Sequence, residues 1–525
     1  MIHDVTLRLN PRTAATKMLL LAAISDSLHI DANRIKDMAV TRRSIDARQR
    51  NVAVNLNVRV WVDEDRQPEP PQPDPYKNTS AGSPQAIVVG AGPAGLFAAL
   101  ELLKHGIRPI VIERGKKVDD RRRDMALISR EGKVDPDSNY CFGEGGAGAF
   151  SDGKLFTRSK KRGSVDDVLR TLVAHGADEA ILIDTHAHIG SDKLPGVIKR
   201  IRETIEAHGG SVVTENRVES LILHNNEVTG VRTASGKEWH GPVILATGHS
   251  ARDVYRMLHN SGIRLEPKGI AVGCRMEHPQ ELIDRMRYHS PAGRGKYLPP
   301  AEYTLSTRID GRGVYSFCMC PGGVIIPAAS APGEIVVNGM SASARSSRWA
   351  NSGMVVEILP EDIPDSINPE APELKLMSFQ ETIEKSFFND SGNGSQNSPA
   401  QRMKDFVDGI ASKDLPASSY PPGLHPARVD KLLPAGVSRR LREGLRQLGA
   451  HNNGFLTNEA VVIGAETRTS SPVRIPRNPE SLNHTDIKGL YPAGEGAGYA
   501  GGIVSAAMDG EKVARSLAAS INASL

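Results

Sequence analysis

The sequence predicts an α/β protein in which a parallel sheet, covered by helices on both faces, carries an inserted α+β cap and follows a small β-α-β-β module. Three observations lead to this fold class. From residue 85 onward, short apolar runs such as AIVV, PIVI and VILA alternate with helical stretches, which is typical of parallel strands buried on both faces. Residues 270–434 are irregular and rich in strands. Residues 52–62 alternate strictly between apolar and polar side chains.

The composition is that of a globular protein with little bulk charge. Lys and Arg number 65 against 61 Asp and Glu in 525 residues, a net charge of +4, which does not indicate a nucleic-acid partner. The N-terminus lacks the pattern of a signal peptide. The longest apolar run, residues 18–24, is far shorter than the ~20 residues that span a bilayer. With four cysteines and no paired zinc-type spacing, we expect a cytoplasmic protein without membrane contact.

The first predicted unit is the β-α-β-β module of residues 1–66. Residues 2–9 alternate as a strand, residues 13–28 carry a helical apolar stripe, and residues 35–45 and 52–62 form a hairpin around RQRN. A linker of residues 67–84 follows, and its proline-rich part favours a stiff, extended spacer. We expect the module to fold independently and to be available to a protein partner.

The remainder divides into three predicted segments. Residues 85–269 form the first part of the nucleotide-binding domain, residues 270–435 the inserted cap or substrate domain, and residues 436–525 the C-terminal part of the nucleotide-binding domain. The last assignment rests on the return of helical and glycine-rich strand–turn–helix patterns after residue 436.

A dinucleotide-binding fingerprint occupies residues 86–113. A buried strand leads into Gly90-x-Gly92-x-x-Gly95, a helix follows, and a second strand ends in Glu113. Gly90 permits a tight turn, Gly92 lets the backbone approach a pyrophosphate, and Gly95 lets the helix pack on the strand. Glu113 is placed to accept hydrogen bonds from a ribose diol, which disfavours a 2′-phosphate. This context predicts a Rossmann-like domain.

A second glycine-rich loop, LYPAGEGAGYAGGIVSAAMDGEKV at residues 490–513, suits a ligand longer than NAD. The chain resembles a family of bacterial FAD-dependent dehydrogenases, flavoprotein oxidoreductases with GxGPAG and YPAGEGAGYAGGI motifs. The strings that carry the resemblance are FGEGGAGAFSDGKL, ATGHSAR, EHPQELID, YSFCMCPGG, ETRTSSPVRIPR and YPAGEGAGYAGGI. The resemblance implies non-covalently bound FAD, a Rossmann-like FAD/NAD(P)-binding domain and a cap, and it implies no particular substrate.

The resemblance also assigns cofactor contacts. For the phosphates and the adenosine the expected residues are Gly90, Gly92, Pro93, Ala94, Gly95, Glu113, Arg114, Gly145, Gly146, Ala147 and Val218. For the ribityl chain and the flavin they are Thr247, Gly248, Gly494, Glu495, Gly501, Gly502 and Ile503. The helix that begins near Ile503 would direct its N-terminus at flavin N1 and O2, where two-electron reduction places negative charge.

Five further residues are candidates for catalysis or ligand binding. His249 and Arg252 follow the strand that ends in ATG, a position where loops of α/β sheets often contact ligands. They could relay a proton or contact a phosphate; the alternative is that they cap a helix or are simply exposed. Arg468 could orient an anionic substrate. Cys318 and Cys320 suggest redox chemistry, but in a regular strand their spacing would strain a disulfide, so two small buried side chains are the alternative. His186-x-His188 lacks ligand partners, and we expect no metal.

These features predict an FAD-dependent oxidoreductase that moves a hydride between its flavin and a small molecule. NAD(P)H could serve as a transient donor, although no second GxGxxG motif follows. One alternative is a flavin-dependent RNA-modifying enzyme that uses the basic runs at 114–123 and 154–162. Another is a flavin-loaded interaction or sensor protein whose N-terminal module binds a partner.

Overall fold

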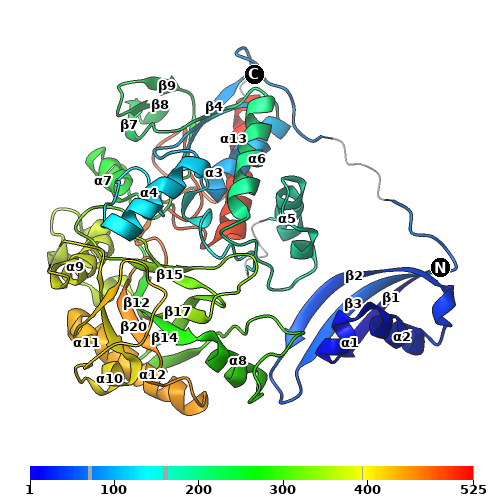
Figure 1. The fold of residues 1–525 in the computed structure, drawn as a ribbon. Coiled ribbons are helices and arrows are strands. Elements are labelled where there is room, and N and C mark those ends of the chain that lie inside the picture. The colour runs from blue at the N-terminus through cyan, green and yellow to red at the C-terminus, as the bar shows by residue number, and fades with distance from the viewer. Residues whose placement is uncertain (69–73, 158–162, 393, 524–525) are drawn as a thin grey trace.

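The protein was analysed as a computed structural model, and the structure describes residues 1–68, 74–157, 163–392 and 394–523. Parts of the predicted linker and of the second basic run therefore lie outside the described residues. The N-terminal module is a three-stranded antiparallel sheet of order β1-β3-β2 with two helices against it (Figure 1). Its elements are β1 (Ile2–Leu9), α1 (Pro11–Ala15), α2 (Lys17–Leu28), β2 (Ile35–Asp46) and β3 (Ala53–Val62).

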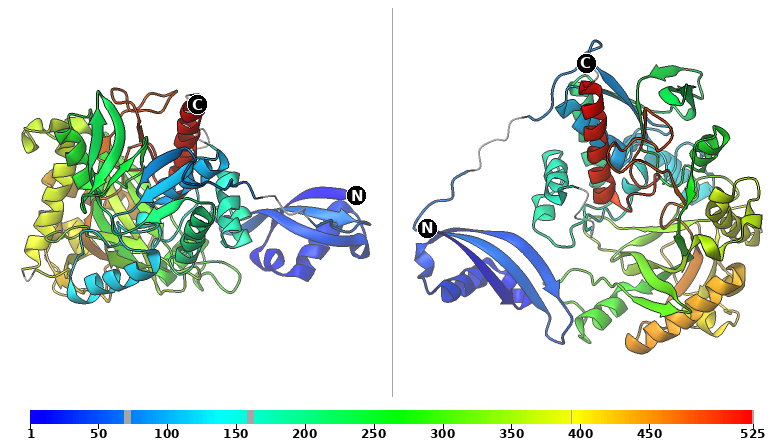
Figure 2. Two further views of the ribbon diagram at one scale, coloured as in Figure 1. Left: turned by 90° about the horizontal axis from the view of Figure 1, so that it is seen from above. Right: turned by 180° about the vertical axis from the view of Figure 1, so that it is seen from behind.

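The alternating strand β3 explains why this module folds. Leu56, Val58 and Val60 project to one face and are at most 1% exposed, because alternate side chains of a strand share a face. They pack with Leu20 and Ile24 of α2 into a core of the module's own. The module stands to one side of the rest of the chain (Figure 2).

In the part of the chain that the structure describes, the N-terminal module contacts the rest of the protein at β2 and at its hairpin end. The Arg43 main chain continues the sheet by pairing with the segment around Asp184, and the two side chains form a bidentate ion pair. At the hairpin end, the carbonyl of Ala47 accepts a hydrogen bond from His289. Ala47 and Val52, which flank this turn, also pack against the apolar core of the cap, while the module keeps a core of its own.

The second unit is a five-stranded parallel sheet of order β22-β10-β4-β5-β6. Its strands are β4 (Gln85–Val89), β5 (Arg108–Ile112), β6 (Ser211–Val213), β10 (Val243–Leu245) and β22 (Leu490–Pro492). The chain builds outward from β4 to β6 and then returns to the other side of β4. The strand order therefore switches between β4 and β10, and open α/β sheets bind ligands at the carboxyl ends of the strands at such a point.

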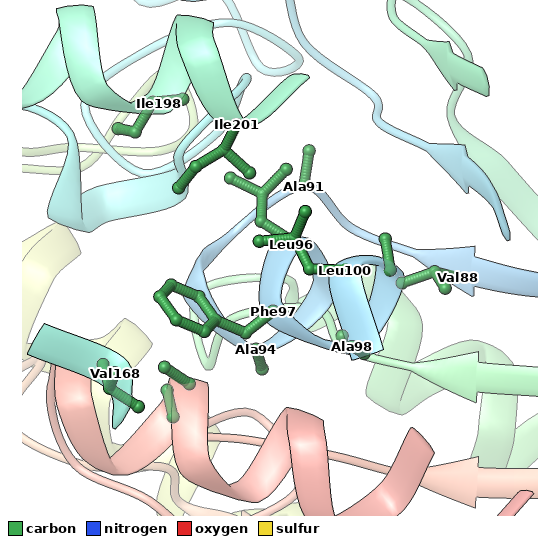
Figure 3. Close-up of a cluster of buried hydrophobic side chains, with 14 of the residues drawn as sticks. Val88, Ala91, Ala94, Leu96, Phe97, Ala98, Leu100, Val168, Ile198 and Ile201 are labelled. Atoms are coloured by element: carbon green, nitrogen blue, oxygen red, sulfur yellow. The ribbon is translucent and has the colours of Figure 1, made fainter. Parts of the chain in front are cut away.

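Helices cover this sheet and pack closely around α3 (Pro93–Lys104). Figure 3 shows Ala94 and Ala98 on the side of α3 that faces α13, while Ile198 and Ile201 approach from α6. The small side chains let α3 and α13 lie close together. The remaining elements of this unit are α4 (Val118–Glu131), α5 (Val165–Ala174), α6 (Leu194–Ala207), β7 (Val218–His224), β8 (Glu227–Thr233), β9 (Glu238–His240), α7 (Arg252–Asn260) and α13 (Ile503–Asn522).

The cap is built on a seven-stranded, mostly antiparallel sheet of order β13-β14-β17-β12-β20-β18-β19. Its strands are β12 (Ile270–Pro279), β13 (Ser306–Ile309), β14 (Arg312–Cys320), β17 (Trp349–Ile358), β18 (Ser398–Arg402), β19 (Leu424–Pro426) and β20 (Val461–Glu466). The other elements are β11 (Glu266–Pro267), α8 (Gln280–Tyr288), β15 (Val324–Pro327), β16 (Val337–Met340), α9 (Lys375–Asp390), α10 (Met403–Asp408), α11 (Val429–Leu432), α12 (Ala435–His451) and β21 (Val473–Arg474).

The return of the chain to the parallel sheet differs from the predicted start at residue 436. Strand β20 pairs with β12 inside the cap sheet, and Leu441 and Leu445 of α12 lie in the cap core. The chain rejoins the parallel sheet only at β22. The amphipathic pattern of α12 predicts a helix but does not specify which sheet its apolar face covers. Among the described residues, no helix is long and apolar enough to cross a membrane.

Candidate cofactor-binding site

The loop between β4 and α3 carries three glycines with different physical roles. Gly90 has φ of +104°, and a Cβ there would lie 2.7 Å from the Ala246 carbonyl oxygen. A Cβ on Gly95 would lie 1.9 Å from the Gly90 carbonyl oxygen, so strand and helix can approach only without a side chain. Gly92 is different, since a Cβ built there meets no atom within 4 Å. The protein's own packing does not require glycine at position 92, which indicates space kept for a ligand.

The loop between β22 and α13 lies directly against the first loop. A Cβ on Gly494 would be 2.7 Å from the Ala94 Cβ, and a Cβ on Gly510 would be 2.0 Å from the Ala94 carbonyl oxygen. The buried carboxylate of Asp509 holds the loop, since it accepts hydrogen bonds from the Gly494 N–H at 2.8 Å and from Arg477. Like position 92, Gly501 and Gly502 have open space where a Cβ would stand.

A third loop, residues 143–148, touches both of the others. A Cβ on Gly146 would be 3.2 Å from the Gly92 Cα, and a Cβ on Gly148 would be 3.2 Å from a side-chain carbon of Ile503. The Gly145 N–H donates to the Ala91 carbonyl at 2.8 Å. Segments from residues 90, 146 and 503 therefore meet at one point, beside the N-termini of α3 and α13.

Arg121 shapes the third loop and was missed by the sequence prediction, which considered residues 114–123 only as a basic run for binding RNA. The side chain is fully buried and donates to five main-chain carbonyls, those of Asn139, Tyr140, Gly143, Glu144 and Gly146. Burial lowers the pKa of Arg121 to about 10, so it stays charged at neutral pH. Its helical spacing from Val118, Met125 and Ile128 places it on the apolar face of α4 and is the signal that could have identified it.

Glu113 lies at the end of β5 and joins the loops around the site. Its carboxylate accepts hydrogen bonds from the N–H groups of Ala91 at 2.8 Å, Gly143 at 2.9 Å and Gly115 at 3.0 Å. A carboxylate has about four lone-pair positions, so one acceptor position remains for a ribose hydroxyl. Val218 lies in the apolar cluster that contains Ile112, close to this end of the sheet.

Arg114 follows Glu113 and lies on the Phe142 ring, with its guanidinium carbon 4.4 Å from the ring centre. It also pairs with Asp253 at 2.5 Å. The guanidinium is thus held in place at the side of the site where the adenosine is expected, and its cation–π contact does not occupy its donors.

Thr247, Gly248 and His249 follow β10, on the other side of the switch point. Gly248 has open space at the Cβ position, while the Thr247 carbonyl packs against Gly496 of the late loop. The His249 Nε2 lies 4.0 Å from a carboxylate oxygen of Glu495. Burial, with the positive charge of Arg468, lowers the pKa of His249 to about 3, and burial raises the pKa of Glu495 to about 7. A neutral imidazole and a carboxyl group that titrates near neutrality therefore stand side by side.

The structure does not place Arg252 and Arg468 as open anion-binding groups. Arg252 donates to Glu384 at 2.7 and 2.8 Å and to Glu334 at 3.2 Å. Arg468 donates to Glu334 at 2.8 Å, to Glu384 at 3.0 Å and to Ser330. Both guanidinium groups are saturated by these partners and nearly buried. The sequence motifs at 246–252 and 466–477 include the two arginines. The carboxylates that neutralise them come from other segments, Glu384 from α9 and Glu334 from the loop before β16.

The remaining predicted residues lie at the edge of this region or outside it. Pro93 is the first residue of α3, where a proline leaves the helix N–H groups undisturbed, and Ala147 is exposed beside Gly146. His186 pairs with Glu302, and His188 with the Ser343 carbonyl at 3.1 Å. Across the described residues, no group of three His, Cys, Asp or Glu side chains is arranged to hold a metal ion.

This arrangement fits FAD. Open positions at Gly92, Gly248, Gly501 and Gly502 leave room where three main-chain loops converge. The N-termini of α3 and α13 supply unpaired N–H groups and a favourable dipole for phosphates and for a reduced flavin. Glu113 retains one acceptor position for the ribose. The residues from the two ends of the domain are thus brought to a single site.

Comparison with known proteins supports the cofactor assignment. Residues 269–469 match the family model described as FAD-dependent protein, C-terminal domain-like, and residues 84–129 match the model of an FAD binding domain. Residues 1–61 match a domain of unknown function, DUF8436. An uncharacterized protein of Clostridium beijerinckii is 39% identical over 509 residues, which cover 94% of each chain.

More distant similarities cover less or are weaker. Protein FixC of Escherichia coli K12 is 26% identical over 201 residues, 38% of this chain and 44% of FixC. A solved structure of a geranylgeranyl bacteriochlorophyll reductase-like protein from Thermoplasma acidophilum has 14% identity and a TM-score of 0.35, covering 85% of this chain and 80% of that one. The fold assignment rests on the strand order and the family models, not on this last similarity.

Proposed function

The chain belongs to the same family as the uncharacterized Clostridium beijerinckii protein, and we propose that it is an oxidoreductase that transfers a hydride between bound FAD and a small molecule. The observation that carries the proposal is the open space at Gly92, at the meeting point of three loops and two helix N-termini. When bound, FAD would accept or donate the hydride at its N5 atom.

The residues of the chain would bind and orient the cofactor. The N–H groups at the start of α3 and the bare backbone at Gly92 would contact the pyrophosphate, and Glu113 would accept from the ribose. The N-terminus of α13, at Gly502 and Ile503, would stabilise negative charge on the flavin ring system.

His249 and Glu495 would hold and move the proton that accompanies hydride transfer. A general acid or base works best when its pKa lies near the working pH, and the pKa of Glu495 is about 7. His249 is neutral and can accept a hydrogen bond at one ring nitrogen while donating at the other. The two side chains are 4.0 Å apart, a distance that a small rotation converts into a hydrogen bond.

The cap would exclude water from this site. Ile326 of β15 is buried among side chains of the parallel-sheet unit, and Met340 of β16 packs against the same cluster. Removing water prevents loss of reducing equivalents and strengthens the electrostatic contacts of the cofactor. We propose a small organic molecule as the substrate and a reduced nicotinamide nucleotide as the electron donor.

The test is an anaerobic titration of the purified protein with NADH and, separately, with NADPH. We expect a yellow protein whose flavin absorbance near 450 nm bleaches with one of the two nucleotides. If dithionite bleaches the flavin but neither nucleotide does, then NADH and NADPH are not the electron donors, and this part of the proposal is wrong. A folded protein that is colourless and cannot be reconstituted with FAD would overturn the proposal.

A further inference from the structure

Two cysteines of the cap lie in a part of β14 that departs from regular strand geometry. The pairing of β14 with β17 shifts between Phe317, opposite Gly353, and Cys320, opposite Asn351. The three residue steps from Phe317 to Cys320 in β14 therefore lie opposite two residue steps in β17, which defines a β-bulge. Cys318 lies in the bulge with φ of +45°, a left-handed conformation that is rare for residues other than glycine. Such backbone strain is found most often at functional sites.

The bulge brings the Cys320 sulfur close to the main chain of residue 318. In a regular strand the side chains of residues 318 and 320 would stand in parallel on one face, which is why the sequence pattern argued against a disulfide. Here the Cys320 S–H donates a hydrogen bond to the Cys318 carbonyl oxygen at 3.5 Å, which folds the Cys320 side chain back toward residue 318. Cys320 is fully buried, whereas Cys318 is partly exposed.

Positive charge surrounds the pair unequally. Arg275, fully buried and paired with Glu466, donates a hydrogen bond to the Cys318 carbonyl at 3.3 Å, and Lys154 lies close enough for its charge to act on both sulfurs. Hydrogen bonding from Cys320, together with Lys154 and Arg275, lowers the pKa of Cys318 to about 5, while the pKa of Cys320 is raised. The partly exposed Cys318 is a thiolate at neutral pH and the buried Cys320 a thiol, which is the arrangement of a nucleophile with its resolving partner.

The pair is coupled by charge to the proposed flavin site. Lys154 is a few residues beyond the loop at 143–148 that contacts Gly92 and Ile503. The negative charge of Cys318 acts on Glu495 in the late flavin loop, whose pKa it helps to raise. No other part of the proposed mechanism uses these two sulfurs.

We propose that Cys318 and Cys320 form a redox pair that exchanges two electrons with the flavin, an inference that rests on the proposed function. The Cys318 thiolate and the Cys320 thiol give up two electrons and one proton and form a sulfur–sulfur bond. Oxidised FAD takes up the two electrons and the proton and becomes the anionic reduced form, so charge and atoms balance. The reverse step reopens the disulfide. The protein thereby stores four electrons per chain instead of two.

Anaerobic titration of the holoprotein with dithionite measures this capacity. Starting from protein oxidised with glutathione disulfide, we expect uptake of four electrons per flavin in the wild type and two in Cys320→Ser. Cys318→Gly gives a second variant, because glycine adopts the left-handed conformation of residue 318 without strain. The matched control is Cys141→Ser, which removes another partly exposed thiol of the same chain and should retain four-electron uptake.

Alkylation and mass spectrometry of the same samples identify the bond. We expect the oxidised wild type to leave Cys318 and Cys320 unlabelled within one peptide, while Cys141 and Cys274 are labelled after unfolding. Uptake of only two electrons by the wild type, or a disulfide to another cysteine, would overturn the proposal while leaving the flavin function intact. A chain that binds no FAD would overturn the proposed function and the electron exchange, and the mass spectrum would still show whether the disulfide forms.

Discussion

Replacement of Gly92 by valine separates cofactor binding from folding. Gly92 has φ of −78° and ψ of −177°, an extended conformation that valine adopts readily. Since a Cβ meets no protein atom within 4 Å, the new side chain creates no internal clash. Gly92 is the N-cap of α3, and β-branched residues are poor caps, so we expect a loss of about 1 kcal/mol in the free energy of unfolding. A domain with the usual ~5–15 kcal/mol of stability tolerates this loss.

The effect on FAD should be larger. The isopropyl group fills the space in which the pyrophosphate approaches the backbone and removes at least one hydrogen bond to a charged group, worth about 1.5–3 kcal/mol. Adding the clash, we expect the dissociation constant of FAD to rise by about 100-fold or more, since each ~1.4 kcal/mol is a factor of ten. Fluorescence titration of the flavin-free protein with FAD measures the constant, and thermal unfolding of the same samples measures stability.

Two further variants sharpen the comparison. Gly82→Val is the matched control, because a Cβ on Gly82 would meet only the Ser80 hydroxyl oxygen at 3.9 Å and the residue lies at an exposed turn outside the site. This variant should bind FAD normally. Gly95→Ala should lose both FAD and stability, because its Cβ would stand 1.9 Å from the Gly90 carbonyl oxygen. If Gly92→Val binds FAD as tightly as the wild type, the pyrophosphate does not lie at this loop and the reasoning fails.

Three other predictions concern buried charge. Arg121→Met leaves five loop carbonyls without their hydrogen-bond donor. We expect urea unfolding of the flavin-free protein to give a free energy of unfolding lower by at least about 3 kcal/mol. A change below about 1 kcal/mol would show that water replaces the guanidinium group. Glu384→Gln removes the negative charge that pairs with the buried guanidinium groups of Arg252 and Arg468, and we expect the free energy of unfolding to fall by about 3–5 kcal/mol. As a control, Asp184→Asn breaks the exposed pair with Arg43 and should change it by less than about 1 kcal/mol. The raised pKa of Glu495 means that the folded, flavin-free protein binds its proton more tightly than the unfolded chain. The free energy of unfolding of the wild type, compared with that of Glu495→Gln, should therefore be greatest below pH 4.5 and fall as the pH rises through about 7. Equal pH profiles for the two proteins would contradict this prediction.

The sequence by itself determined the parts of the molecule that depend on neighbouring residues. Gly90 and Gly95 are required by turn geometry and close strand–helix approach, so their spacing predicted a tight strand–turn–helix loop where the structure has one. The strict alternation in β3 predicted the sheet of the N-terminal module, because side-chain direction in a strand has a period of two. Continuous apolar runs predicted the parallel strands, because both faces of that sheet are covered.

Tertiary structure alone decided how distant segments pair. Arg252 and Arg468 have the same local sequence whether they face an anion or the carboxylates of Glu334 and Glu384, and only the packing of α9 beside them selects the second outcome. The bulge at Cys318 likewise depends on the register between β14 and β17. Strand β20 lies inside the cap sheet between β12 and β18, and these pairings join residues that are far apart in the sequence. Local periodicity specifies which face of an element is apolar, but the partner of that face is set by the free energy of the whole packed chain.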